Sequence, residues 1–115
     1  MRERERVYAA LTASGIKGTY VAYPVGKAPP LPWFTYREED GGEFFADDAN
    51  YSDLPRFVAH LYQESVDAQV EDRFAAAVAT IGPYRKTQAW SATENCLITI
   101  FQFTLAKPTK EENNG

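Results

Sequence analysis

The sequence predicts an α+β fold, with a mainly antiparallel sheet of about four to five strands and two helices packed on one face of the sheet. Three observations predict this class. One long run carries apolar residues at helical spacing, several short runs are rich in aromatic and β-branched residues, and Gly and Pro separate these runs. The expected order is helix, strand, strand, strand, helix, strand, strand, with a short hairpin return after the second strand.

The first half of the chain predicts one helix and two strands. In residues 2–14, Val7, Ala10, Leu11 and Ser14 fall at helical spacing, and Gly15 is suited to end the helix. Residues 19–23 predict a strand that stops at Pro24. After a proline-rich loop, residues 33–37 predict a second strand, and Asp40-Gly41-Gly42 predicts a tight turn before a return through residues 43–45.

The second half predicts a strand, a helix and a closing hairpin. Residues 56–63 are apolar on both sides, which is typical of a central strand. Ser65 is expected to cap a helix, with Asp67 near its positive end, and Gly82-Pro83 is expected to end it. The apolar stripe of this helix is Val66, Val70, Phe74, Ala77, Val78 and Ile81.

The last two strands are expected at residues 84–90 and 96–105. The final strand places Leu97, Thr99, Phe101, Phe103 and Leu105 on one side and Cys96, Ile98 and Ile100 on the other. Because both sides are apolar, we expect this strand to be covered on both sides. Two helices cover only one side of the sheet, so the second side is expected to need a neighbouring molecule.

Length and charge restrict the class of protein. With 115 residues, the chain is expected to form one domain over residues 1–106, followed by a flexible polar tail over 107–115. The formal net charge of −4 argues against general binding to nucleic acid or to an anionic membrane. A single cysteine, Cys96, and the lack of an apolar leader or spanning segment favour a protein made in a reducing cytoplasm.

Motifs for catalysis or cofactor binding are missing from the sequence. His60 is the single histidine, and its place in an apolar strand is more typical of a half-buried sheet residue than of a base or ligand. Neither a Gly-x-Ser-x-Gly nor a glycine-rich phosphate motif is present. We therefore expect no enzyme activity, no catalytic residue, no cofactor and no metal.

An acidic cluster surrounds the expected hairpin tip. Solvated charge that protects an edge strand is the favoured interpretation, although the sequence leaves open whether the cluster binds a cation. A functional alternative is that the cluster lines a lumen or meets a basic partner. Its members are Glu38, Glu39, Asp40, Glu43, Asp47 and Asp48.

Aromatic residues are abundant for the length of the chain. They could form a stacking platform for single-stranded nucleic acid, but few basic residues lie among them, so core packing and a protein interface are favoured. Candidates for a subunit interface are Phe44, Phe45, Tyr51 and Trp90. The aromatic residues considered are Trp33, Phe34, Tyr36, Phe44, Phe45, Tyr51, Phe57, Tyr62, Tyr84, Trp90, Phe101 and Phe103.

Three segments resemble the tail completion proteins, or tail terminators, of long-tailed bacteriophages. They are Leu31-Pro32-Trp33-Phe34-Thr35-Tyr36, then Phe44-Phe45-Ala46-Asp47-Asp48-Ala49-Asn50-Tyr51, then Val58-Ala59-His60-Leu61-Tyr62-Gln63-Glu64-Ser65. A glycine, an aromatic residue and two closing strands follow the second helix, as Gly82, Tyr84 and residues 96–103 do here. One departure is Gln63-Glu64-Ser65, where basic residues often follow Leu-Tyr in the family.

The resemblance implies a structural virion protein without catalysis. Six copies would form a ring that caps the tail tube and joins it to the head-proximal connector, after assembly in the host cytoplasm. A ring buries a heterologous interface on each subunit, which suits a surplus apolar sheet face. The alternative is a small cytoplasmic dimeric module of α+β type that binds a ligand or protein through that face.

Overall fold

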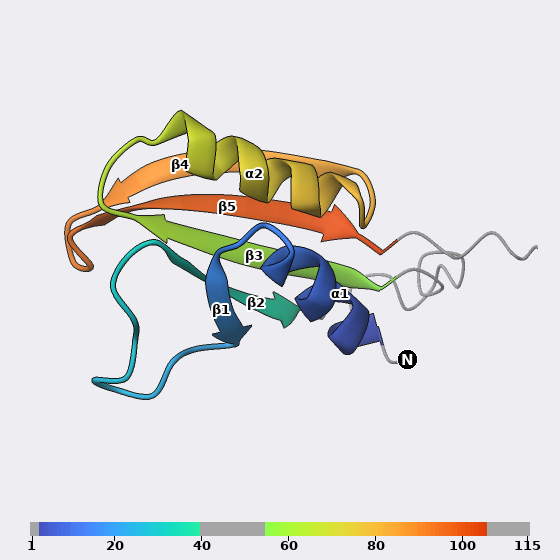
Figure 1. Ribbon diagram of the computed structural model, residues 1–115, viewed down its shortest axis with the longest axis horizontal. Helices are drawn as coiled ribbons and strands as arrows, with labels where there is room; N and C mark the ends of the chain where they lie inside the picture. The colour runs from blue at the N-terminus through green and yellow to red at the C-terminus, as the bar shows by residue number, and fades with distance from the viewer. Residues whose placement is uncertain (1–2, 40–54, 106–115) are drawn as a thin grey trace, which may run out of the picture.

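Two helices and five strands make up the residues that the computed structural model describes, 3–39 and 55–105. The order matches the predicted α+β order (Figure 1). The expected hairpin return at 43–45 and the expected tail at 107–115 lie outside the described residues. In chain order the elements are α1 (Glu3–Thr12), β1 (Lys17–Tyr20), β2 (Trp33–Glu38), β3 (Arg56–Gln63), α2 (Ala68–Ala79), β4 (Tyr84–Ser91) and β5 (Cys96–Thr104).

The strands form one sheet in the order β1-β2-β3-β5-β4. β1 runs parallel to β2, while the other three neighbouring pairs are antiparallel. The register is marked by His60, which lies opposite Thr35 of β2 on one side and Ile100 of β5 on the other. β3 is therefore the central strand, as its apolar character on both sides predicts.

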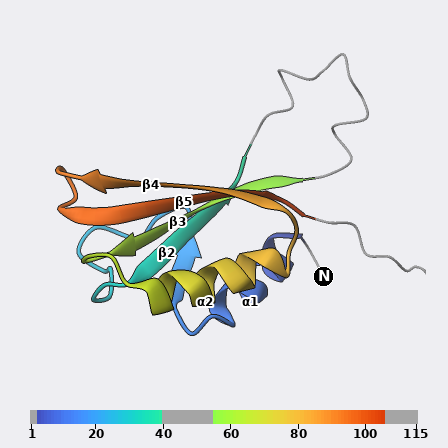
Figure 2. The same ribbon diagram turned by 90° about the horizontal axis from the view of Figure 1, so that it is seen from above.

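Both helices lie against the same face of the sheet, which we call the helix face (Figure 2). The core forms between them, and its largest fully buried side chains include Phe34, Phe57, Phe74 and Phe101. Phe74 of α2 lies between two of these rings, with centroid distances of 5.2 Å to Phe34 and 5.3 Å to Phe101. Phe74 thus ties α2 to strands β2 and β5, which flank β3.

Helix α2 begins later than the sequence predicts. Asp67 is the N-cap, and its carboxylate accepts hydrogen bonds from the backbone N–H groups of Gln69 and Val70. Ser65 does not cap the helix. Val66 precedes the cap and is 70% exposed, so it was wrongly included in the apolar stripe, whose other members, Val70, Phe74, Ala77, Val78 and Ile81, are buried.

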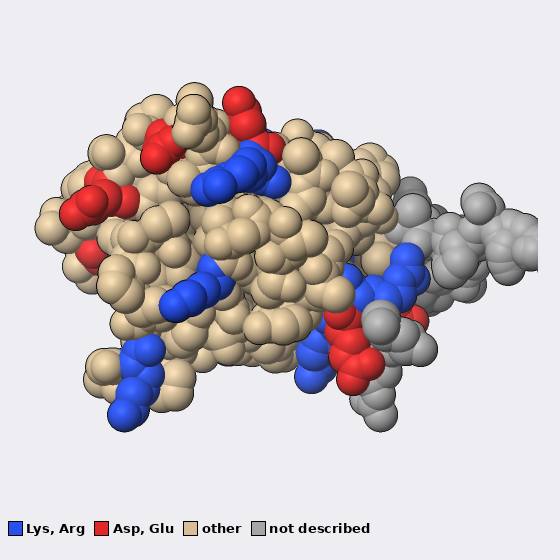
Figure 3. Space-filling model, viewed as in Figure 1, with Lys and Arg blue, Asp and Glu red and all other residues tan. Residues whose placement is uncertain are grey.

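Carboxylates gather at the end of the molecule where α2 begins (Figure 3). Asp67 caps the helix there, and Glu71 reaches back to accept a hydrogen bond from the Asp67 backbone N–H. Negative charge at a helix N-terminus is stabilised by the helix dipole. The position of these acids therefore follows from the direction of α2.

Strand β1 is shifted toward the N-terminus relative to the predicted range of 19–23. It starts at Lys17 and ends at Tyr20, because Val21 adopts a φ of 69°, which an extended strand cannot contain. Helix α1 buries Val7 and Leu11, as predicted, and Gly15 adopts a φ of 87° just beyond it. This left-handed conformation is the one that favours glycine after a helix.

Candidate protein interface

The face of the sheet opposite the helices carries a mixed aromatic and aliphatic surface, which we call the open face. Strand alternation and register bring its side chains together from β2, β3, β5 and β4. Ile98 lies between Tyr62 and Ala89, and Ile100 lies between His60 and Thr87. The open face includes Trp33, Thr35, Arg37, Val58, His60, Tyr62, Cys96, Ile98, Ile100, Gln102, Arg85, Thr87 and Ala89.

Among the described residues neither helix covers the second side of β5, so the expectation that a neighbouring molecule covers that side stays a prediction. Cys96 is buried, but Ile98 and Ile100 are only half-buried. The reason is that both described helices lie on the helix face, so neither helix covers the side of β5 that carries Ile98 and Ile100 (Figure 2). An apolar centre of this kind, left half-exposed, is typical of a protein interface.

Trp33 and Tyr62 form the aromatic centre of the open face. They are opposite one another in the β2–β3 register, and their rings stack at 4.3 Å with an angle of 30°. The ring of Tyr23, from the loop before β2, meets Trp33 edge-on at 5.2 Å, and His60 lies 6.2 Å from the Tyr62 ring. Because each ring is held by its neighbours, this surface is ordered before any partner binds.

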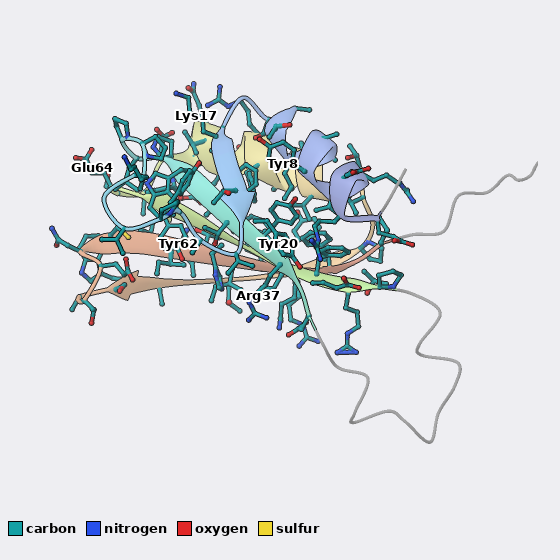
Figure 4. All side chains as sticks on the ribbon, turned by 90° about the horizontal axis from the view of Figure 1, so that it is seen from below. Tyr8, Lys17, Tyr20, Arg37, Tyr62 and Glu64 are labelled. Carbon is teal, nitrogen blue, oxygen red and sulfur yellow. The ribbon has the colours of Figure 1, made fainter. Side chains whose placement is uncertain are left out.

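Tyr62 is the polar end of this aromatic group. Burial raises the pKa of Tyr62, while a hydrogen bond with the Thr35 side chain lowers it in part. The phenol is therefore neutral near pH 7 and serves as a hydrogen-bonding group beside an apolar ring. Figure 4 labels Tyr62 and Arg37, both on strands of this face.

His60 is a half-buried sheet residue, as the sequence predicts. Burial lowers the pKa of His60, and the positive charge of Arg37 lowers it further. His60 is therefore neutral near pH 7, so the centre of the open face carries no charge there, and Arg37 supplies a positive charge toward one end of the face. This arrangement suits contact with another protein surface better than acid–base chemistry.

Strand β4 forms an exposed edge of the sheet. Residues 84–90 are all exposed, and Trp90 and Tyr84 retain 54% and 41% of their surface. Trp90 is a predicted interface residue, and the register places it opposite Leu97, on the helix face, so it does not join Trp33 and Tyr62. On this side Lys86 lies 3.7 Å from Glu71 of α2.

Two of the predicted acidic residues are described. Glu38 ends β2 and is exposed, and its backbone N–H donates to the Tyr20 hydroxyl. The Glu39 backbone N–H donates to the Arg56 carbonyl at 2.7 Å. The other predicted site residues lie outside the described residues and stay predictions: Asp40, Glu43, Phe44, Phe45, Asp47, Asp48 and Tyr51. Within ranges 3–39 and 55–105, no group of three metal-binding side chains occurs.

The structure adds residues that the sequence reasoning did not single out as an interface. Trp33 and Tyr62 were among the aromatic residues expected in the core or in a protein interface, and Ile98 and Ile100 were expected on a covered strand. Strand pairing brings all four together on the open face. The signal that could have found them is the side-chain alternation in two adjacent strands, which needs the β2–β3 register. β2 begins immediately after Pro32, and the sequence does not fix how β2 aligns with β3. A one-residue shift in that alignment would move every side chain of β2 to the other face of the sheet.

Comparisons with protein-family models, curated proteins and solved structures gave no match for this chain. In the described part of the chain, neither helix has the length and apolar character that crossing a membrane requires. The geometry of the open face and of the β4 edge is therefore the basis for the functional argument below.

Proposed function

We propose that this chain is a self-assembling structural protein of the kind that terminates bacteriophage tails, with six copies in a ring that caps the tail tube. The observation that carries the proposal is the open face. One side of the sheet is closed by both helices, while the other presents the stacked Trp33 and Tyr62 and the half-buried Ile98 and Ile100. A second copy of the chain is the occupant that we propose for this surface.

A heterologous contact suits the asymmetry of this surface. The open face is aromatic near Trp33 and Tyr62 and positively charged near Arg37. A partner surface that complements both ends must itself be apolar at one end and acidic at the other. The carboxylates around the start of α2, shown in Figure 3, provide acidic groups on a different side of the same molecule. Contacts between two different surfaces of identical subunits generate rings when the rotation closes.

The tail-terminating role is supported by the resemblance in three segments, two of which contribute to the open face. Trp33 and Thr35 come from the first segment, and Val58, His60 and Tyr62 come from the third. The proposal predicts partners at the two rims of the ring, the tail-tube protein and the head-proximal connector. It requires no catalytic group and no cofactor.

The test images the purified chain by negative stain and then adds it to the tail-tube protein encoded by the same genome during tube polymerisation. We expect rings with a central hole, and tubes that stop growing and carry a ring at one end. Tubes that reach the same length with and without the chain would contradict the terminator role. Compact dimers without a hole would instead favour the small dimeric binding module.

A further inference from the structure

The outer edge of β4 is a second surface, formed by outward backbone groups of the strand at the border of the open face. β4 is the last strand in the sheet order, and its backbone hydrogen bonds within the described residues are made to β5 alone. Residues 84–90 are exposed, and the strand contains no proline. An edge strand of this length presents a row of unpaired N–H and C=O groups to a further strand.

We propose that β4 pairs with β4 of a second copy, antiparallel about a two-fold axis, with Thr87 opposite the partner's Thr87. The paired strands would join two five-stranded sheets into one continuous sheet and keep both helix faces on the same side. This inference does not depend on the proposed function, because the contact uses the edge of the sheet and leaves the aromatic centre of the open face, Trp33 and Tyr62, free.

The side chains of β4 select this register. In β4, every second residue points its backbone N–H and C=O away from β5. When two copies pair antiparallel, such residues lie opposite one another only if the two-fold axis passes through a residue position and not between two residues. Pairing centred on Lys86 would place two lysines opposite one another, which is destabilising. Pairing centred on Gln88 would leave Tyr84 beyond the partner strand. Pairing centred on Thr87 places each Tyr84 opposite a Trp90, the two exposed aromatic residues of the strand.

Charge and cross-strand packing favour the same register. Centred on Thr87, the contact pairs Arg85 with Ala89 and Lys86 with Gln88, so no two cations are directly opposite. The two Thr87 side chains face one another on the open-face side, and threonine pairs and aromatic pairs are both favourable cross-strand contacts. Each molecule contributes residues 84–90 to the paired strands.

The helices do not prevent this pairing. Phe74 of α2 contacts Phe101 of β5 and Glu71 of α2 lies 3.7 Å from Lys86 of β4, and Figure 1 shows α2 in front of these two strands. In the paired sheet, two to three strand spacings would separate the two α2 helices, or about 10–14 Å. Helices pack at about 8–10 Å, so the two α2 helices do not overlap.

The test is site-specific disulfide formation in the full chain. In the proposed register the Cα atoms of two Thr87→Cys residues would lie about 5 Å apart, within the range that a disulfide bridges. Two Arg85→Cys residues would lie about 14 Å apart and could not be bridged. The unsubstituted chain, with its buried Cys96, measures background cross-linking.

We expect Thr87→Cys to form covalent dimers under mild oxidation at least tenfold faster than Arg85→Cys or Gln88→Cys. A mixture of Arg85→Cys and Ala89→Cys should form the mixed dimer in preference to either homodimer. Cross-linking through Gln88→Cys instead would overturn the register, and equal rates at all positions would overturn the contact. Repeating the Thr87→Cys reaction with Tyr62→Lys present separates this contact from assembly through the open face. Tyr62 lies on β3, two strands away from β4, so the rate of cross-linking should be unchanged.

Discussion

The close approach of β1 to β2 gives a specific prediction about Gly18. An alanine methyl at position 18 would overlap the ring of Phe34, which is fully buried and is held by Phe74 at 5.2 Å. The ring cannot move without displacing core side chains, and overpacking of this kind costs about 1–3 kcal/mol. At about 4 °C per kcal/mol for a domain of this size, Gly18→Ala should lower the Tm by about 4–12 °C.

The assay is thermal and urea unfolding followed by circular dichroism, with Thr19→Ala as the control in the same strand. A second substitution tests the cause. Phe34→Leu shortens the side chain that the new methyl meets, so the double variant should be at least about 1 kcal/mol more stable than the sum of the two single effects. Additive effects, or a Gly18→Ala protein as stable as the original, would refute the packing argument.

Two further predictions concern α2 and His60. Asp67→Ala removes the acceptor for the Gln69 and Val70 N–H groups and should cost about 1 kcal/mol of unfolding free energy, whereas Ser65→Ala should change it little; equal costs measured by urea unfolding would argue against this cap. The pKa of His60 is lowered from 6.5 in the folded protein, so the unfolded chain takes up a proton first as the pH falls. Stability should be fully present above about pH 6.5 and should decrease below it until the folded histidine also titrates. His60→Gln should flatten this decrease, and a pH profile identical to that of the unsubstituted chain would show that His60 does not cause it.

The element order could be predicted because each local pattern agrees with the final packing. The spacing of Val70, Phe74 and Val78 requires a helix with one buried face, and all three are buried. The first residues of that helix could not be assigned in the same way. Val66 has the correct spacing, but the carboxylate of Asp67 satisfies the first free N–H groups of the helix and places Val66 before the cap. The capping interaction of Asp67 therefore sets the start of α2, which the apolar periodicity alone could not define.

The candidate site depended more on tertiary structure. The apolar residues on both sides of β5 predicted a strand covered on both sides, with a neighbouring molecule on the side away from the helices. The residues predicted for that contact, Phe44, Phe45, Tyr51 and Trp90, are not those that the sheet register places on the open face. The sequence did not distinguish Trp33 from Phe34, and both were expected in the core or in a protein interface. In the structure Phe34 lies in the core, while Trp33 stacks on Tyr62 on the open face. Only the pairing of β2 with β3 distinguishes the two positions. The positive φ of Val21, which ends β1, likewise has no local sequence signal such as glycine.

Assembly through the open face is the central claim, and the mass of the protein in solution tests it most directly. Light scattering across a concentration series should give six times the subunit mass of 12.9 kDa, or a multiple of six where the β4 edges also pair. Ile98→Lys with Ile100→Lys should abolish the six-subunit assembly, while lysine at the exposed Val25, away from both proposed surfaces, should leave it intact. An unchanged mass for the open-face variant, with native circular dichroism, would contradict the claim.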